Sequence, residues 1–398
     1  DRHTQVASVV GWHRRAVRRA AAISSKGSRM LYNDVPSRRE LESLAAVVGP
    51  TCLSVYTPNE AAADAPDAHR VAFENQTRKA LEHVDDAAER AEFAEGLADL
   101  LDDEEFWRYQ SRSLVVLASG DHVHVHRVAN HLEASETVGD RYFLKPLLRA
   151  VTFPQTAFIL ALSEGAVRLV EISAEGPAET VEVAGMPDSA SDHAGKSSLS
   201  DRAPRGRLQG TEGRKVLVRQ YSRAVDQSLR SVLTGRDVPL ILAATEPIAS
   251  IFRSVNSYPG LLAEGIEGNP EERSDADLAA TARGVLDGHY AEQLAEARQL
   301  YQVRRGQGRG QSDLADIARS ATYGLVDTLF VDIDSFTPGN LDPQSGAIEY
   351  PESAAGTGYD VVDEMARRTL LQGGRILAVR ADEVPEGGKA AAMLRYAP

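Results

Sequence analysis

The sequence predicts a mixed α/β protein of several domains, and three observations lead to this prediction. The chain has 398 residues, enough for about two or three domains of ordinary size. Helical and strand periodicities alternate along it, and breaks near residues 111 and 259 interrupt them. We therefore expect a basic, disordered extension over 1–30, an N-terminal α/β domain over 31–110, a middle domain over 111–258 and a C-terminal domain over 259–398.

Composition restricts the partners and the compartment. Hydrophobic residues make up 42% of the chain, and no apolar run is long enough to span a bilayer. With 44 basic and 58 acidic residues the net charge is −14, so the molecule as a whole repels DNA and anionic lipid, and any RNA contact must be local. The single cysteine, Cys52, rules out an internal disulfide, and we expect a cytoplasmic protein without a cofactor.

The first 29 residues differ in composition from the rest of the chain. Their only acidic residue is Asp1, whereas basic residues are frequent: Arg14, Arg15, Arg18, Arg19, Lys26 and Arg29. A transit peptide and a basic arm that touches RNA are two interpretations. We favour a third, an upstream extension with Met30 as the natural start, because folded-domain patterning begins only near Pro36.

In the N-terminal domain, Ser37 begins a capping box, which predicts a short helix that ends at Gly49 and Pro50. Residues 51–56 alternate as a strand, and residues 70–103 are helical with an acidic outer face. Cys52 falls in the apolar strand and is expected to be a small core residue.

The middle domain should contain a mixed sheet. Hairpins are expected from residues 113–118 with 122–128 and from 156–163 with 166–172, with a short helix over 145–151 and an edge strand over 180–183. A long exposed loop over 185–213 precedes a helix over 214–233, a buried strand over 239–244 and a helix over 248–255. Antiparallel hairpins followed by a helix and a buried strand indicate a ribonuclease H-like fold.

The C-terminal domain alternates helices and strands. A long helix over 275–303 leads to a basic turn over 304–310 and a helix over 313–322. The apolar run 326–333 is typical of a central strand, and a helix over 361–371, ended by Gly373, precedes a buried strand over 375–379. This order predicts a layered α/β/α domain.

Three segments carry a family resemblance. They are the run Val-Gly-Asp-Arg-Tyr-Phe-Leu-Lys-Pro-Leu-Leu at 138–148, the Gly- and Pro-rich segment 258–271, and Val-Asp-Thr-Leu-Phe-Val at 326–331. Together they resemble bacterial archaeo-eukaryotic release factor-like proteins, in particular family three. The resemblance implies a ribonuclease H-like middle domain, a Pelota-like C-terminal domain and a ribosome-associated role. The implied partners are the ribosome and ribosomal RNA, with an elongation factor as a further candidate.

One departure from release factors alters the expected activity. Release factors hydrolyse peptidyl-tRNA with a Gly-Gly-Gln tripeptide, and this sequence has none. Where that loop would fall, Gln209 is the nearest glutamine, and it lacks the two preceding glycines. We therefore expect ribosome rescue or stress-linked dormancy, also called hibernation, in place of termination, and no catalytic residue.

Positive charge is concentrated in the segment 192–236. Ten basic and four acidic residues give it a local charge of +6. On the helix 214–233, the side chains expected to face inward are Leu217, Tyr221, Val225, Ser228 and Val232, which leaves basic residues on the other side. The candidate RNA-binding residues are Lys196, Arg202, Arg205, Arg207, Arg214, Lys215, Arg219 and Arg223. The alternative interpretation is a solvated helix face that only keeps the protein soluble.

Two other functions are weighed against this one. The alternative is a metal-dependent nuclease or hydrolase of ribonuclease H-like fold, which would use either His122, His124, His126 and His131 or the carboxylates Asp121, Glu171, Asp327, Asp332 and Asp334. Same-face positions on a strand are about 7 Å apart, too wide for easy shared coordination, so we expect surface histidines and no metal. A third hypothesis is an interaction module whose acidic N-terminal domain binds a basic protein.

Overall fold

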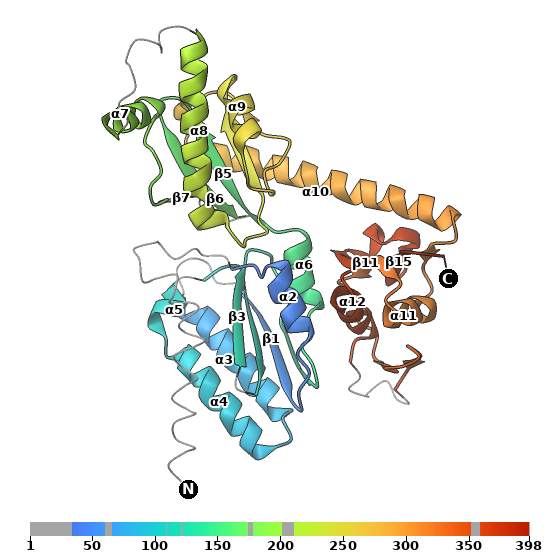
Figure 1. The fold of residues 1–398 in the computed structure, drawn as a ribbon. Helices are drawn as coiled ribbons and strands as arrows, with labels where there is room; N and C mark the ends of the chain where they lie inside the picture. Colours follow the sequence, from blue (N-terminus) through green and yellow to red (C-terminus); the bar gives the residue numbers. More distant parts are fainter. Residues whose placement is uncertain are drawn as a thin grey trace. The chain divides into compact units, whose positions relative to one another are not determined.

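The structure is a computed structural model that describes residues 34–59, 66–108, 110–120, 122–173, 178–200, 211–351 and 359–397. Figure 1 shows helices and sheets along the whole described chain, which confirms the mixed α/β class. The described residues form two compact units: unit 1 contains 34–153 and 293–397, and unit 2 contains Pro154–Glu292. The predictions for the basic extension concern residues outside the described ranges.

The N-terminal part of unit 1 is built on one antiparallel sheet. Its strands are β1 (Cys52–Pro58), β2 (Ser113–Ser119), β3 (His122–Val128) and β4 (Ser135–Gly139), in the order β3-β2-β1-β4. The predicted hairpin is present, but β2 pairs with β1 along its whole length. The boundary predicted near residue 111 falls inside this sheet, where the change of periodicity marks a switch from helix to strand.

Helices cover both faces of this sheet. On one face lie α3 (Pro66–Glu82), α4 (Ala87–Leu101) and α5 (Glu104–Arg108), whose apolar side chains form a core with Leu53, Val55 and Val116. The alternate side chains Cys52 and Tyr56 point to the other face, towards α2 (Arg38–Ala45) and α6 (Lys145–Thr152). The capping box at Ser37 is confirmed, with Ser37 Oγ accepting from the Glu40 N–H at 3.4 Å.

The C-terminal part of unit 1 is a layered α/β domain, as the pattern predicted. Its sheet has the order β10-β15-β11-β14, in which β11 (Val326–Asp332) is parallel to β14 (Arg375–Val379) and antiparallel to β15 (Ala390–Leu394). The short strand β10 (Gly310–Gln311) forms the edge, and α11 (Leu314–Thr322) and α12 (Val361–Leu371) pack on the sheet. Apolar residues of α11, α12 and β11 share one hydrophobic cluster with Tyr56 and α6.

Unit 2 has a five-stranded mixed sheet. Its strands are β5 (Thr156–Leu162), β6 (Val167–Ser173), β7 (Glu179–Val181), β8 (Leu240–Ala244) and β9 (Ile266–Glu267), in the order β7-β6-β5-β8-β9. Strand β6 pairs antiparallel with both β5 and β7, whereas β8 pairs parallel with both β5 and β9. This is the mixed sheet predicted for the middle domain.

The limits of unit 2 differ from the predicted range 111–258. Strand β9 completes the sheet, and apolar residues from the first turns of α10 (Asp275–Gly306) cover one face, so the predicted boundary at residue 259 falls inside unit 2. Helices α8 (Thr211–Leu233) and α9 (Ile248–Val255) also cover the sheet, and α7 (Ala190–Ser200) packs against α8 (Figure 1). No helix among the described residues is both long and apolar enough to cross a membrane.

Candidate functional site

The candidate site is the solvent face of α8, and its position follows from the amphipathic sequence of that helix. Val218, Tyr221, Val225, Leu229 and Leu233 are almost completely buried. Their spacing of three and four residues holds one side of the helix against unit 2. The predicted inward orientation is confirmed for Tyr221 and Val225. Leu217, Ser228 and Val232 are only partly buried, because the helix is rotated slightly from the predicted orientation.

The basic residues of α8 fall into different environments. Arg214, Lys215, Arg219 and Arg223 are all exposed. Arg214 forms an ion pair with Glu164 at 3.0 Å, and Lys215 also has an interaction partner. Within the described residues, no carboxylate lies in ion-pair distance of Arg219 or Arg223. These two guanidinium groups, one helical turn apart, are the cations that α8 offers to an external anion.

The side chains of the other predicted RNA-binding residues lie outside the described part of the structure. Lys196 lies in α7, near the end of that helix, and its side chain is outside the description. Arg202, Arg205 and Arg207 lie outside the described residues, as does Gln209. Among the described side chains of this set, the structure brings together Arg214, Lys215, Arg219 and Arg223, because consecutive turns of one helix carry them.

The loop predicted over 185–213 is partly helical. Residues 190–200 form α7, which the sequence analysis missed because its hydroxyl and glycine residues show no apolar periodicity. The segment before α7 folds back onto α8, where Ser228 Oγ donates to the Gly185 carbonyl at 2.9 Å. Between this segment and α8 lies a cavity of about 590 Å³. Its lining residues are Ala184, Gly185, Met186, Pro187, His193, Ala224, Gln227 and Ser228.

A second basic cluster of the sequence, around residues 304–310, does not form an anion site. Arg304 pairs with Asp327 at 2.6 Å, Arg305 pairs with Glu386, and Arg309 donates to the backbone carbonyls of Leu394 and Arg395. The expected turn is also shorter, since α10 continues to Gly306. Internal contacts thus occupy all three guanidinium groups, in contrast to Arg219 and Arg223.

The candidates for a metal site are dispersed. On β3, His122 is exposed, His124 stacks edge-on against Tyr142, and His126 is buried. Burial lowers the pKa of His126, which favours the neutral imidazole. Within the described ranges, no three His, Cys, Asp or Glu side chains are grouped to hold a metal ion.

No three of the described carboxylates of the nuclease alternative form a group that could hold a metal ion. Asp327 holds Arg304, Asp332 accepts from the Asp334 N–H at 3.0 Å, and Glu171 is buried on β6 of unit 2. Asp121 lies outside the described residues. Cys52 is fully buried with its thiol 3.3 Å from Ser119 Oγ, and burial raises the pKa of that thiol, so it is a core residue as predicted.

The motif at 138–148 joins the two parts of unit 1. Lys145 is 2% exposed, and its Nζ lies 2.6 Å from Asp360 Oδ2. The backbone N–H groups of Leu144 and Lys145 donate to Asp363 Oδ1 at 3.0 and 2.5 Å. These contacts attach the first turn of α6 to the first turn of α12.

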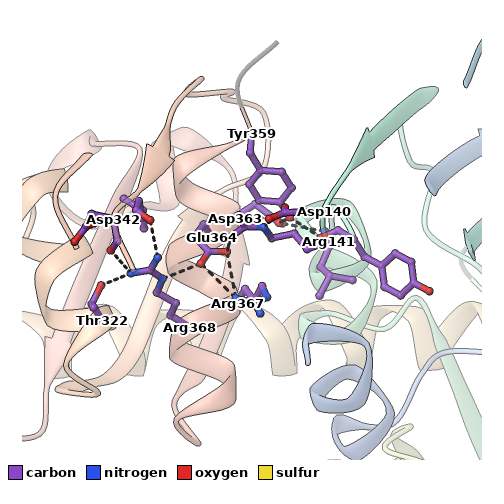
Figure 2. Close-up of polar contacts among 12 residues, drawn as sticks. Asp140, Arg141, Thr322, Asp342, Tyr359, Asp363, Glu364, Arg367 and Arg368 are labelled. Carbon is purple, nitrogen blue, oxygen red and sulfur yellow. Dashed lines mark hydrogen bonds and ion pairs between the residues drawn. The ribbon is translucent and has the colours of Figure 1, made fainter. Parts of the chain in front are cut away.

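A second set of charges extends this connection (Figure 2). Arg141 pairs with Glu364 at 2.5 Å and lies over the Tyr359 ring, and the Tyr359 hydroxyl contacts Asp363. Glu364 also accepts a hydrogen bond from Arg368, whose Nη1 donates to Thr322 Oγ1 at 2.6 Å. The motif therefore has a structural role inside unit 1, and sequence reasoning, which used it only as a family signature, missed that role.

The other two motifs are structural as well. In the segment 258–271, a Cβ on Gly265 would lie 2.6 Å from the Leu242 carbonyl oxygen, so only glycine allows β8 and the following loop to approach so closely. The segment 326–331 is the central strand β11, whose Leu329, Phe330 and Val331 are completely buried.

Comparison with known proteins supports the release factor-like resemblance for unit 2. Residues 154–292 match the family model described as bacterial archaeo-eukaryotic release factor family 11. This range coincides with unit 2. The coarse resemblance is thus supported by a match, while the family number three is not confirmed. No curated protein sequence matches the chain.

Similar solved structures include several translation factors. An archaeal translation termination factor, aRF1, is 13% identical with a TM-score of 0.24, and the alignment covers 90% of this chain and 98% of that one. Dom34 of S. cerevisiae, a translation termination-like factor, is 9% identical with a TM-score of 0.40 over 72% and 74% of the two chains. Archaeal Pelota, from a model of its ribosome-bound form, is 13% identical with a TM-score of 0.38 over 90% and 93%.

Proposed function

We propose that this protein is a ribosome-associated, release factor-like protein that contacts ribosomal RNA through the exposed face of α8. One observation carries the proposal: Arg219 and Arg223 project from a well-packed helix and have no carboxylate partner in the described part of unit 2. The release factor-like family match falls on the same unit. A net charge of −14 disfavours general binding to polyanions, so contact must be made through such a local cationic surface.

The proposed role is ribosome rescue or stress-linked dormancy. A Gly-Gly-Gln tripeptide is absent from the 398 residues, so the chain lacks the group with which release factors orient the hydrolytic water. A protein that docks without releasing the peptide would act by occupying or marking a ribosome. Such a role places the protein in the cytoplasm, with an elongation factor as a further candidate partner.

Co-sedimentation with ribosomes at several salt concentrations tests this function. We expect the protein to pellet with ribosomes at low salt and to dissociate steeply as salt rises, because phosphate contacts release counterions. The double variant R219E/R223E should lose most of this binding and reduce the slope of log K against log salt by about 2, roughly one for each phosphate contact removed.

A matched control changes the same charge elsewhere. Arg78 on α3 and Arg319 on α11 are exposed residues of unit 1. The variant R78E/R319E has the same net charge as R219E/R223E and should pellet like the wild type. If both variants lost ribosome binding equally, the loss would be an effect of net charge and not of the α8 face. Failure of the wild-type protein to pellet with ribosomes at any salt concentration would refute the proposed function.

A further inference from the structure

The cavity beside α8 borders the cationic face directly. Ala224, Gln227 and Ser228 form its wall on α8, and Arg223 immediately precedes Ala224. Arg219 lies one helical turn before Arg223, and Gln227 lies one turn after it. A chain of phosphates held by the two arginines would therefore pass along the rim of the cavity.

The lining suits a flat, partly polar group. Met186, Pro187 and Ala224 supply apolar surface, and methionine adapts readily to the shape of what it contacts. Polar groups come from the His193 imidazole and the exposed Gln227 amide, which can both donate and accept hydrogen bonds. The volume of about 590 Å³ lies in the range of ordinary small-ligand sites.

The charge distribution orients such a ligand. On the side opposite α8, the exposed Asp188 directly follows the lining residue Pro187 and repels phosphate, whereas the α8 rim carries Arg219 and Arg223. A nucleotide would thus place its base inside the cavity and its phosphates on the rim. A double-stranded segment cannot do this, because its bases remain paired and stacked.

We propose that the cavity between residues 184–193 and α8 binds the base of an unpaired RNA nucleotide whose flanking phosphates contact Arg219 and Arg223. The inference rests on the proposed function, which it makes more specific: α8 recognises single-stranded or bulged RNA in preference to duplex. His193 and Gln227 contact the base edge, and the apolar lining packs against its faces.

Fluorescence anisotropy with short labelled oligonucleotides tests this site in the full chain. The probes are a uridine RNA decamer, the same sugar–phosphate decamer without bases, a uridine DNA decamer and an RNA duplex. We expect the wild type to bind the uridine RNA decamer about tenfold more tightly than the abasic one, because the abasic decamer cannot bury a base against the apolar lining. Duplex should bind more weakly than the uridine decamer, and a DNA decamer that binds as well as RNA would overturn the RNA assignment.

Three variants separate the cavity from the cationic rim. A224W fills the cavity and should weaken binding of the uridine decamer about tenfold, with no further loss on the abasic decamer and an unchanged salt slope. H193A/Q227A keeps Arg219 and Arg223 and should reproduce part of this loss, so the site is still tested if A224W does not fold. R219E/R223E should weaken all probes and lower the salt slope.

The outcomes distinguish this inference from the function on which it depends. If the wild type pellets with ribosomes but binds uridine and abasic decamers equally, the base site is refuted and the ribosomal function stands. The base site is also refuted if A224W and H193A/Q227A both bind the uridine decamer with wild-type affinity. It is refuted as well if an unstructured peptide occupies the cavity and competes with RNA there but not at the cationic rim. If the wild type does not pellet, both proposals fail.

Discussion

Replacing Lys145 by methionine is expected to destabilise unit 1 by about 3–5 kcal/mol, the usual cost of leaving one charge of a buried pair uncompensated. The Nζ of Lys145 lies 2.6 Å from Asp360 Oδ2, and both side chains are at most 2% exposed. Asp360 cannot turn away to find water, because its Oδ1 caps α12 through the Val362 N–H at 3.0 Å. The methionine variant therefore buries a carboxylate without its cation.

Urea unfolding followed by tryptophan fluorescence measures this loss. The chain has two tryptophans, and Trp107 is buried in unit 1, so a W12F background leaves a single reporter of that unit. The double variant K145M/D360N removes both charges and should recover part of the stability. R319M breaks an exposed pair with Asp316 and should cost less than about 1 kcal/mol. Equal losses in K145M and R319M would contradict a buried ion pair.

The second large effect is a pH dependence of stability that comes from Asp363. Its carboxylate accepts from the backbone N–H groups of Leu144 and Lys145 and contacts the Tyr359 hydroxyl (Figure 2). Complete burial raises the pKa of Asp363 to about 7, although the Tyr359 hydrogen bond opposes this shift. The folded state thus binds a proton that the unfolded state, with an ordinary carboxyl pKa of about 4, releases.

The direction of the effect follows from proton linkage. A raised pKa in the folded state contributes stability that is fully present below about pH 4 and is lost as the pH rises through about 7. Between pH 5 and pH 8 this group should therefore cost the wild type about 3 kcal/mol, at 1.36 kcal/mol for each pH unit below the folded pKa.

The variant D363N isolates this contribution. Asparagine retains an oxygen for the two backbone N–H groups but does not titrate, so its free energy of unfolding should lack the decline between pH 5 and pH 8. Other titrating groups, such as the buried His69 and His126, contribute equally to both proteins and cancel in the difference. Parallel pH profiles for D363N and the wild type would show that Asp363 remains ionised in the folded protein.

Local patterns in the sequence correctly predicted most helices and strands. The capping box at Ser37, the hairpin over 113–128, the amphipathic α8 and the apolar strand β11 each depend on residues close together in the chain. Periodicity and caps are local properties, so they can be read without knowing the fold. The elements that were missed include α7, β4 and β15, which have weak patterns: α7 is rich in serine, β4 is only partly buried along its length, and β15 is mostly alanine.

The grouping of these elements into domains required tertiary information. The hairpin 113–128 joins β1 across more than 50 residues, and β9 joins β8 beyond the predicted boundary. Strand pairing is a long-range interaction, and a change of periodicity does not say which sheet a strand will join. The predicted boundaries therefore fell inside unit 1 and unit 2.

The sequence by itself determined the positive charge of the segment 192–236, the absence of Gly-Gly-Gln and the amphipathic character of α8. Only the tertiary structure decided which cations are available. Arg304, Arg305 and Arg309 form a basic cluster in the sequence but contact carboxylates and carbonyls of their own unit, whereas Arg219 and Arg223 face solvent. The physical reason is that a side chain's charge is fixed by its covalent structure, but its partners are set by residues that folding brings from elsewhere in the chain.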